Sequence, residues 1–398
     1  MQKMINSVQN YAWGSRDALT RLYGIPNNQR LPMAELWMGA HPQNSSQLIN
    51  DQKEKHALCD LIQQNPAAYL WPQAQKGDQL PFLFKVICAA QPLSLQVHPN
   101  KQAAQKGFAK ENANGIPIRV KERLYKDDNH KPELVYALTP FKAMNSFRTI
   151  EDLQKLFTPL VEAHPDIHLF VEKPNLKHLS IVFLSLLTMT DETKKRALSV
   201  LQSVVAGRSD EPWSTIQHIA SFYPEDLGLF APVFLNVITL QPGEAIFLEA
   251  QTPHAYIKGV ALEVMANSDN VLRAGLTEKW IDIPELMANV RFVPKPASNL
   301  LTLPLQRENQ QIFPVPVSDF AFSVYQLKSD GQLLTPNIIS IIFCMDGNAR
   351  LDQKGKKLEL IPGESCFCSA RESSIRVYGK GKIAYVFHTP INIKPDYL

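Results

Sequence analysis

The chain has 398 residues, of which 45% are hydrophobic and 20% are charged, and its formal net charge is +3 at pH 7. This length exceeds what a single hydrophobic core ordinarily organises, so we expect two or three domains. The charge is nearly balanced, and no basic stripe is interleaved with aromatic residues. Nucleic acids and membranes are therefore not expected as partners.

Targeting and redox signals favour the cytoplasm. The first residues lack the apolar core of a secretory signal. The longest apolar run, residues 179–187, is far too short to span a bilayer and is predicted to be a buried helix. The five cysteines are odd in number and follow no disulfide spacing, so we expect free thiols in a reducing compartment.

Residues up to about Pro140 are predicted to be rich in strands, with helical inserts such as residues 57–70. From Thr149 the apolar period becomes helical, because residues 149–152 carry a cap with an acidic residue at its third position. Strands are expected to return from Phe230.

Two more helices are predicted within this middle stretch. Residues 191–206 have a helical pattern that ends at Gly207, a residue suited to the left-handed conformation that closes helices. Residues 213–222 have a similar pattern and stop before Pro224, which cannot continue a helix.

A strand with strict alternation is predicted at residues 92–99. The residues of its apolar face are Leu93, Leu95 and Val97, and those of its polar face are Ser94, Gln96 and His98. Solvated surface strands alternate in the same way, so alternation alone does not indicate a site. Polar residues on three other predicted strands strengthen the interpretation of this strand as part of a site.

Lys131 and Glu133 share one face of a predicted strand, and His254 and Tyr256 share one face of another. The second of these follows a Pro-Gly turn, a short strand and a loop. Both segments therefore place metal-binding or ionisable side chains on strands rather than in loops.

A third segment places Glu263 on a strand and then continues through a polar loop to Arg273. Taken together, His98, Glu133 and His254 provide two imidazoles and one carboxylate. These are ligand types that zinc accepts, and a catalytic site leaves one further position open. The spacing matches no compact zinc motif, so the inference rests on alternation and on the clustering of polar residues.

The last third of the chain contains a repeat of an earlier segment. Residues 240–247 align with residues 360–367, both with a Pro-Gly-Glu turn, and without gaps His254 falls opposite Ser374. A repeated turn in the same strand context indicates a duplicated jelly roll. The second barrel would then have the fold without the ligand.

In these motifs the chain resembles type I mannose-6-phosphate isomerases, the zinc-dependent phosphomannose isomerases of bacteria and fungi, and most closely those of the enterobacterial type. The resemblance extends over nearly the whole chain. The matching motifs are NYAWGS (10–15), AELWMGAHP (34–42), FKV (84–86), LQVHP (95–99), KPE (131–133), TPHAY (252–256), EVMANSDN (263–270) and VLRAGLT (271–277).

The resemblance implies a mainly β fold, with two cupin-like jelly-roll barrels and a helical insertion. We predict a catalytic cupin-like domain formed by two segments, a helical insertion domain, and a carboxy-terminal jelly roll that lacks metal ligands. The catalytic domain is predicted at residues 1–148 and 225–290, the helical insertion at residues 149–224, and the carboxy-terminal jelly roll at residues 291–398. A chain with its own paired barrel is expected to be a monomer.

The resemblance also implies one zinc ion per chain, held by Gln96, His98, Glu133 and His254. Gln96 is not a ligand that the residue types alone would suggest. One carboxylate and three neutral ligands leave a formal charge of about +1 on the doubly charged ion. A less neutralised zinc is a stronger Lewis acid.

The implied reaction interconverts mannose 6-phosphate and fructose 6-phosphate by moving a proton between C2 and C1, through a cis-enediol. Lys131 and Glu263 are rival candidates for the base. A zinc ion close to Lys131 would favour its neutral amine. Arg273 is expected to contact the substrate, either at its phosphate or at the enediolate oxygens.

Five residues have less specific expected roles. His130 and Asp269 are candidates for assisting ring opening, and Ser94, Lys85 and Tyr256 are candidates for binding sugar hydroxyls or phosphate. An ordinary structural role is about as frequent for such residues.

Two other classes of protein compete with this interpretation. Cupin enzymes that act on other sugar phosphates or on uronic acids usually carry His-x-His followed closely by Glu, whereas here Gln96 replaces the first histidine and Glu133 is distant. A non-enzymatic sugar-binding barrel would not need Arg273, Lys131 and Glu263 around a metal. It should also purify without stoichiometric zinc.

Overall fold

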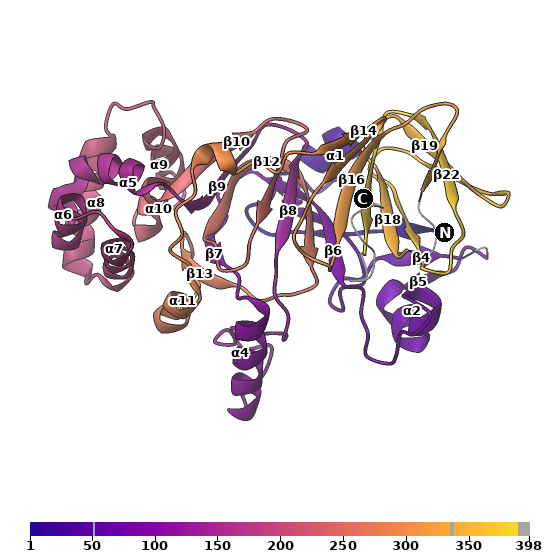
Figure 1. The fold of residues 1–398 in the computed structure, drawn as a ribbon, viewed down its shortest axis with the longest axis horizontal. Coiled ribbons are helices and arrows are strands. Elements are labelled where there is room, and N and C mark those ends of the chain that lie inside the picture. The colour runs from indigo at the N-terminus through magenta and orange to yellow at the C-terminus, as the bar shows by residue number, and fades with distance from the viewer. Residues whose placement is uncertain (51, 335–337, 389–398) are drawn as a thin grey trace.

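The computed structural model describes residues 1–50, 52–334 and 338–388 of the chain. Figure 1 shows an elongated molecule with helices at one end, a β domain in the middle and a second group of strands at the other end. Among the described residues, no helix is both long and apolar enough to cross a membrane. The predicted mainly β fold with a helical insertion is confirmed.

The central β domain contains ten strands within the described residues. Six of them lie in the order β10 (Leu235–Leu240), β9 (Phe141–Phe147), β12 (His254–Ala266), β6 (Phe82–Ala89), β3 (Glu35–Met38) and β2 (Ser7–Gln9), and the other four are β7 (Leu95–Val97), β8 (Glu133–Ala137), β11 (Ala245–Leu248) and β13 (Leu272–Gly275).

Strand β12 connects the two faces of this domain. Its first half, from His254, pairs with β7 and β9, and its second half, from Gly259, pairs with β6 and β8. Gly259 has φ +128°, and a Cβ there would lie 2.5 Å from the Pro140 carbonyl oxygen. Only glycine therefore fits where the strand changes partners, and His254 and Glu263 lie on opposite sides of that point.

The second β domain is built from a nine-stranded and a four-stranded sheet of the described residues. The larger has the order β14 (Leu305–Arg307), β15 (Gln310–Phe313), β16 (Ala321–Gln326), β23 (Lys382–Phe387), β18 (Ser340–Cys344), β21 (Ser365–Cys368), β1 (Gln2–Ile5), β4 (Gln47–Ile49) and β5 (Lys55–Ala57), and the smaller has the order β17 (Gln332–Leu334), β22 (Ile375–Lys380), β19 (Asn348–Gln353) and β20 (Lys356–Leu360). The amino-terminal strand β1 thus joins carboxy-terminal strands, because Gln2 is paired with Phe367.

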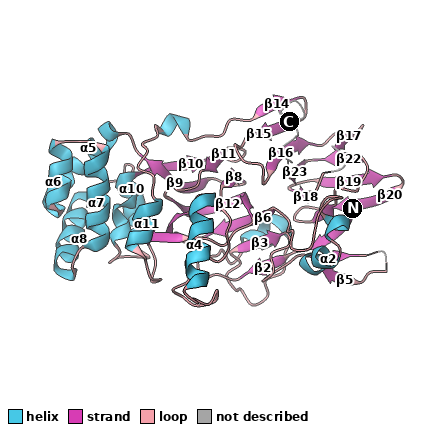
Figure 2. Ribbon diagram, turned by 60° about the horizontal axis from the view of Figure 1, so that its bottom comes forward, coloured by secondary structure: helices cyan, strands magenta, loops and turns pink. Residues whose placement is uncertain are grey.

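The helices are gathered mainly between β9 and β10 (Figure 2). Those of this insertion are α5 (Ile150–Phe157), η1 (Thr158–Ala163), α6 (Pro165–Glu172), α7 (Leu176–Thr188), α8 (Asp191–Val205), α9 (Trp213–Ala220), η2 (Leu227–Phe230) and α10 (Ala231–Phe234). The other helices of the described residues are α1 (Ala18–Tyr23), α2 (Leu58–Gln64), α3 (Pro66–Tyr69), α4 (Lys101–Ala113), α11 (Ile283–Asn289) and η3 (Ala297–Asn299).

Several helix predictions are confirmed. Thr149 caps α5, because its hydroxyl accepts a hydrogen bond from the Asp152 amide at 3.2 Å. The apolar run at 179–187 lies within α7. Residues 57–70 form two short helices, because Pro66 begins a new one at α3.

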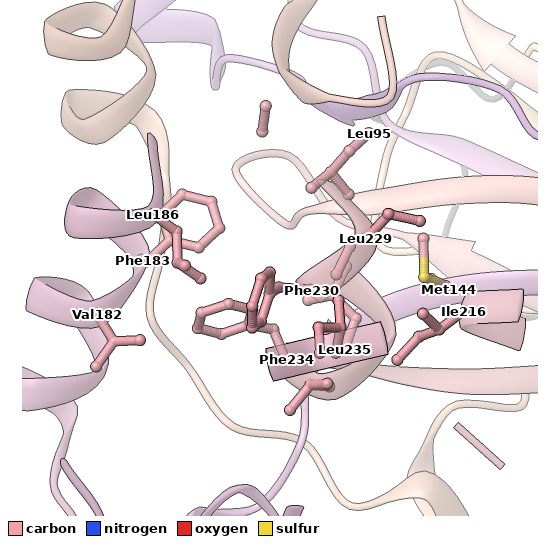
Figure 3. Packing of buried hydrophobic residues seen from close by; sticks show 14 of the residues in the cluster. Leu95, Met144, Val182, Phe183, Leu186, Ile216, Leu229, Phe230, Phe234 and Leu235 are labelled. Atoms are coloured by element: carbon pink, nitrogen blue, oxygen red, sulfur yellow. The ribbon is translucent and has the colours of Figure 1, made fainter. Parts of the chain in front are cut away.

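The helical insertion packs on the outer face of β7 and β9. In Figure 3 the side chains of Phe183 on α7 and Phe234 on α10 lie face to edge, with ring centroids 5.6 Å apart. Leu95 of β7 and Met144 of β9 belong to the same buried cluster. Because neighbouring side chains of a strand point to opposite faces, Gln96 is directed away from the helices and into the β domain.

The two β domains share a hydrophobic core. Phe84 of β6 and Tyr136 of β8 contact Phe322 of β16, with ring centroids 6.4 Å and 5.5 Å apart. Phe84 also meets Phe343 of β18 at 6.0 Å. The second β domain therefore covers one side of the first instead of being joined to it by a flexible linker.

The predicted repeat corresponds to equivalent strands. The turns at Gly243 and Gly363 both have positive φ and lead into the four-residue strands β11 and β21. After each short strand, a long strand begins at His254 and a shorter one begins just after Ser374. The five cysteines, all of which are described, are free as predicted.

Candidate metal centre and active site

Three strand ends meet inside the central β domain. His98 follows β7, Glu133 begins β8 and His254 begins β12. All three side chains are almost completely buried, and their ligand atoms lie within 4.8 Å of one another. The alternation that predicted these residues thus leads to one cluster.

Within this cluster the carboxylate lies between the two imidazoles. The Oε1 atom of Glu133 is 3.4 Å from His98 Nε2, and its Oε2 atom is 3.3 Å from His254 Nε2. The two imidazole rings are 5.0 Å apart between centroids. The two Nε2 atoms and the carboxylate oxygens thus face one another.

Backbone carbonyls fix the orientation of both rings. His98 Nδ1 lies 2.8 Å from the Asn270 carbonyl, and His254 Nδ1 lies 2.9 Å from the Thr252 carbonyl, so each Nδ1 carries the proton and donates it. The Nε2 lone pairs are then free to coordinate a metal, as is usual for metal-binding histidines. His98 Nε2 is buried without any hydrogen-bond partner, which fits a metal ligand.

The charge states of the cluster also suit a cation. Burial, assisted by the positive charge of Lys131, lowers the pKa of His98 to about 4, so the ring is neutral near pH 7. Burial raises the pKa of Glu133, but Lys131 and the two histidines outweigh that effect and hold it well below its usual range. A neutral imidazole and an ionised carboxylate are the metal-binding forms.

Gln96 is on the same side of the sheet as this cluster. In the strand register it lies opposite His254 on β12 and opposite Arg273 on β13. Residues that face each other in antiparallel strands project from the same face. Gln96 is thus near the cluster, and its role as a fourth ligand stays a prediction.

Lys131 and Tyr256 contact the cluster directly. The Lys131 ammonium lies 3.1 Å from Glu133 Oε1, and the Tyr256 hydroxyl lies 3.3 Å from Glu133 Oε2. The same hydroxyl donates a shorter hydrogen bond, 2.6 Å, to Glu263 Oε1. Tyr256 therefore connects Glu133 with Glu263.

Glu263 is buried and both of its oxygens have partners. Its Oε2 accepts a hydrogen bond from Lys85 at 3.0 Å, and Lys85 lies 3.9 Å from Glu35. Burial raises the pKa of Glu263, with the attraction of Lys85 opposing it. Burial lowers the pKa of Lys85, but Glu263 and Glu35 outweigh it and raise the net value.

The two candidates for ring opening are separated. His130 Nε2 lies 3.0 Å from Asp319, which belongs to the second β domain. Asp269 is one-third exposed and lies 3.1 Å from His41 Nε2.

Ser94 is half-buried next to β7. The structure thus brings Lys131 and Tyr256 to the cluster, and it engages His130 elsewhere.

A basic cavity lies beside the Asp269 loop, and we call it the cationic cavity. It has a volume of about 540 Å³, and its charged lining residues are Arg119, Lys121, Arg123, Lys126, Arg273, Lys279, Glu122, Asp269, Glu278 and Asp282. Burial, followed by the charges of Arg273 and Lys126, lowers the pKa of Lys279. Burial alone lowers the pKa of Arg273, and no carboxylate of the described residues forms an ion pair with it. The six basic residues of the lining outnumber its four carboxylates, and this excess of positive charge favours an anionic ligand.

Several residues near the site were not predicted from the sequence, namely Glu35, His41, Lys126, Asp127, Asn270 and Lys279. Glu35, His41 and Asn270 lie in motifs that carried the family resemblance, so those motifs were the available signal. Lys126 and Asp127 lie in a loop, where alternation gives no information.

The fold and the site together define a mainly β protein with a helical insertion and a buried His-Glu-His centre next to a cationic cavity. Residues 1–150 match the family description "Phosphomannose isomerase type I, catalytic domain". Residues 156–235 match its helical insertion domain, and residues 309–388 match "Mannose-6-phosphate isomerase, cupin domain".

Known proteins agree with these matches. The chain is 55% identical to the mannose-6-phosphate isomerase of Escherichia coli K12 over 389 residues, which cover 98% of this chain and 100% of that one. The human enzyme of that name is 32% identical over 92% of this chain and 93% of its own. The chain therefore belongs to the type I mannose-6-phosphate isomerase family, as its motifs indicated.

Solved structures show the same fold. A single-residue mutant of the Salmonella typhimurium phosphomannose isomerase superposes with a TM-score of 0.95 at 55% identity, covering 98% of this chain and 100% of that one. A zinc-bound mannose 6-phosphate isomerase superposes with a TM-score of 0.94 at 55% identity, with 98% and 99% coverage.

Proposed function

We propose that this protein is a zinc-dependent aldose–ketose isomerase that interconverts mannose 6-phosphate and fructose 6-phosphate. The observation that carries the proposal is the buried cluster of His98, Glu133 and His254, whose Nε2 atoms and carboxylate oxygens converge. Support comes from the relatives of that name, one of them 55% identical over 98% of the chain.

His98, Glu133 and His254 would hold the zinc ion, with Gln96 as the proposed fourth ligand. When bound, zinc supplies a Lewis acid that stabilises negative charge on the substrate oxygens at C1 and C2. The protein contributes rigid orientation, because backbone carbonyls hold both imidazoles.

We place the substrate phosphate in the cationic cavity. Beyond the effect of burial, Arg273 and Lys126 lie close enough to Lys279 for their charges to lower its pKa. Arg273 offers a planar fork of donors that matches phosphate oxygens. Because Arg273 is opposite Gln96 in the strand register, a sugar with its phosphate here extends toward the metal cluster.

Between the two candidate bases, the geometry favours Lys131. Its amine lies against Glu133 and its side chain is 11% exposed, so it can meet a substrate bound at the cluster. Glu263 would first have to give up contacts with Lys85 and Tyr256. Lys131 takes the proton from C2 of the open-chain aldose, which leaves a cis-enediolate with its negative charge at O1; a proton then passes from O2 to O1, and Lys131 returns its proton to C1 to give the ketose.

For ring opening we favour Asp269 over His130. Asp269 lines the cationic cavity, and the contact with His41 fixes its carboxylate. Burial alone would raise the pKa of Asp269, but the hydrogen bond from His41 and the positive charges of His41, Lys131 and Lys126 together outweigh burial and lower the pKa. His130 is held by Asp319 and has no such access.

The three-part domain division predicted from the sequence remains our proposal, with the second barrel in a structural role. Its bounds need adjusting, because β1, β4 and β5 lie in the sheet of the second β domain and the helices of the insertion continue to Phe234. The contacts of the second barrel through Phe322 and Phe343 support its structural role. The monomeric state and the cytoplasmic location also remain predictions.

The test is fructose 6-phosphate formation from mannose 6-phosphate, before and after removal of metal by a chelator, with zinc then added back. We expect chelation to abolish activity and zinc to restore it, because the proton transfer needs charge stabilisation at both oxygens. A His254→Ala variant treated in the same way should not recover. Activity that persists after complete metal removal would contradict the mechanism, and a folded, zinc-loaded protein without activity would point to another sugar phosphate.

A further inference from the structure

Asn270 occupies an unusual position between the metal cluster and the cationic cavity. It lies in the loop between β12 and β13 and is completely buried. Its main-chain carbonyl accepts the hydrogen bond from His98 Nδ1 at 2.8 Å. The orientation of one metal ligand thus depends on where this loop is held.

The side chain of Asn270 holds the loop by using both ends of its amide. Its Oδ1 accepts from the backbone amide of Lys126 at 2.7 Å, and its Nδ2 donates to the carbonyls of Asp127 at 2.8 Å and Asn129 at 2.9 Å. These partners belong to the segment that leads directly into Lys131 and Glu133. One buried amide therefore joins the loop behind His98 to the segment before β8.

Asp127 completes the connection in the opposite direction. Its Oδ2 accepts from the Asp269 amide at 2.7 Å, and its Oδ1 accepts from the Ser268 hydroxyl at 2.8 Å. The two segments are thus linked by reciprocal hydrogen bonds. Asp269 and Lys126, both in the lining of the cationic cavity, are fixed by the same network.

Aspartate cannot replace this amide. Aspartate has the same shape, but it has no donor, so its oxygen would face the carbonyls of Asp127 and Asn129 in place of Nδ2. Buried oxygens in contact without a proton between them repel, and unsatisfied buried acceptors are costly. The loop would shift to relieve this contact, and the carbonyl that orients His98 would shift with it.

We infer that Asn270, supported by Asp127, is a positioning residue that sets the orientation of His98 for zinc and the place of Lys126 in the cationic cavity. The inference rests on the proposed function, because it presupposes zinc at His98, Glu133 and His254. It adds a joint control of metal affinity and substrate binding by one residue that contacts neither ligand.

The experiment compares Asn270→Asp with the wild-type protein in two measurements. Zinc affinity is measured by competition with a chromogenic chelator, and kcat and KM are measured at saturating zinc. We expect zinc affinity to fall roughly 10- to 100-fold, the range found when groups that orient metal ligands are replaced. KM for mannose 6-phosphate should rise because Lys126 is displaced.

Asn236→Ala is the matched control. Asn236 is also a fully buried amide, and its Nδ2 donates to the Lys295 carbonyl at 2.9 Å, but it bonds none of the three metal ligands. We expect this variant to lose thermal stability and to keep its zinc affinity. A merely structural role for Asn270 would give the same result as the control.

A folded Asn270→Asp protein that binds zinc within threefold of wild type would overturn the inference. If Asn270→Asp does not fold, Asp127→Asn replaces it as the test. This substitution keeps the shape of the side chain but places an amide nitrogen or a weaker acceptor against the backbone amide of Asp269. Unchanged zinc affinity in Asp127→Asn would also overturn the inference. Failure of the wild type itself to bind zinc would instead refute the proposed function.

Discussion

Replacing Arg273 by alanine tests how the site binds its substrate. Arg273 is half-buried in the cationic cavity, near Lys126 and Lys279, and no carboxylate among the described residues pairs with it. The free protein therefore loses no ion pair on substitution. We expect the melting temperature of Arg273→Ala to stay close to that of wild type, because no buried partner is left unsatisfied.

The cost should instead appear in substrate binding or turnover. A hydrogen bond to a charged group contributes about 1.5–3 kcal/mol, and the guanidinium fork can donate two to one phosphate. Losing both removes about 3–6 kcal/mol, which corresponds to a fall of roughly 10²- to 10⁴-fold in kcat/KM.

The steady-state assay also separates the two possible contacts of Arg273. If the guanidinium holds phosphate, which stays unchanged through the reaction, KM should rise and kcat should change little. If it contacts the enediolate oxygens, kcat should fall with kcat/KM. Our placement of the phosphate predicts the first pattern, together with weaker competitive inhibition by inorganic phosphate.

Arg291→Ala is a suitable control because its guanidinium is half-exposed and lies 3.8 Å from Glu249, away from the cationic cavity. Its kinetics should equal those of wild type. A zinc-loaded Arg273→Ala protein with kcat/KM within threefold of wild type would refute the reasoning and remove Arg273 from the site.

Four other substitutions have defined outcomes. His254→Ala should lose zinc, measured by metal analysis, while circular dichroism shows the fold retained; stoichiometric zinc in this variant would contradict the proposed ligand set. Lys131→Met should keep zinc and lose about 10²- to 10⁴-fold in kcat, the usual contribution of a general base. A near-normal kcat would return Glu263 to consideration. Phe322→Ala should lower the free energy of unfolding by about 3–5 kcal/mol in urea, as large-to-small changes in a core do. Because Phe322 belongs to the core shared by both β domains, the whole unfolding transition should shift to lower urea concentration. A shift of only part of the transition would argue against a shared core. Ser374→Ala should change neither zinc content nor activity, and a loss of either would show that the second barrel has a site of its own.

The sequence predicted the metal cluster because strands have a period of two. Alternation at β7 placed Gln96 and His98 on one face, and the same argument placed Glu133 and His254 on theirs. Their meeting point could not be derived from alternation. It arises because β12 pairs with β7 at its first residue and with β8 further on, so three strand ends come together.

Loop residues of the site were beyond sequence reasoning for a related reason. Asp127 and Asn270 have no periodic context, and their roles come from hydrogen bonds between segments distant in the chain. His130 shows the opposite case, since it neighbours Lys131 in sequence but contacts Asp319 of the second β domain. Proximity in sequence did not place its side chain at the site.

The sequence by itself thus indicated the strands, the helices and the candidate ligands, because these depend on local periodicity and on residue chemistry, and its motifs indicated the family and the fold class. Only the tertiary structure decided which charges are paired. Glu263 is engaged by Lys85 and Tyr256, whereas Arg273 has no carboxylate partner among the described residues. Electrostatic pairing depends on distances of a few ångströms between charged side chains of different strands, and packing and strand register set those distances.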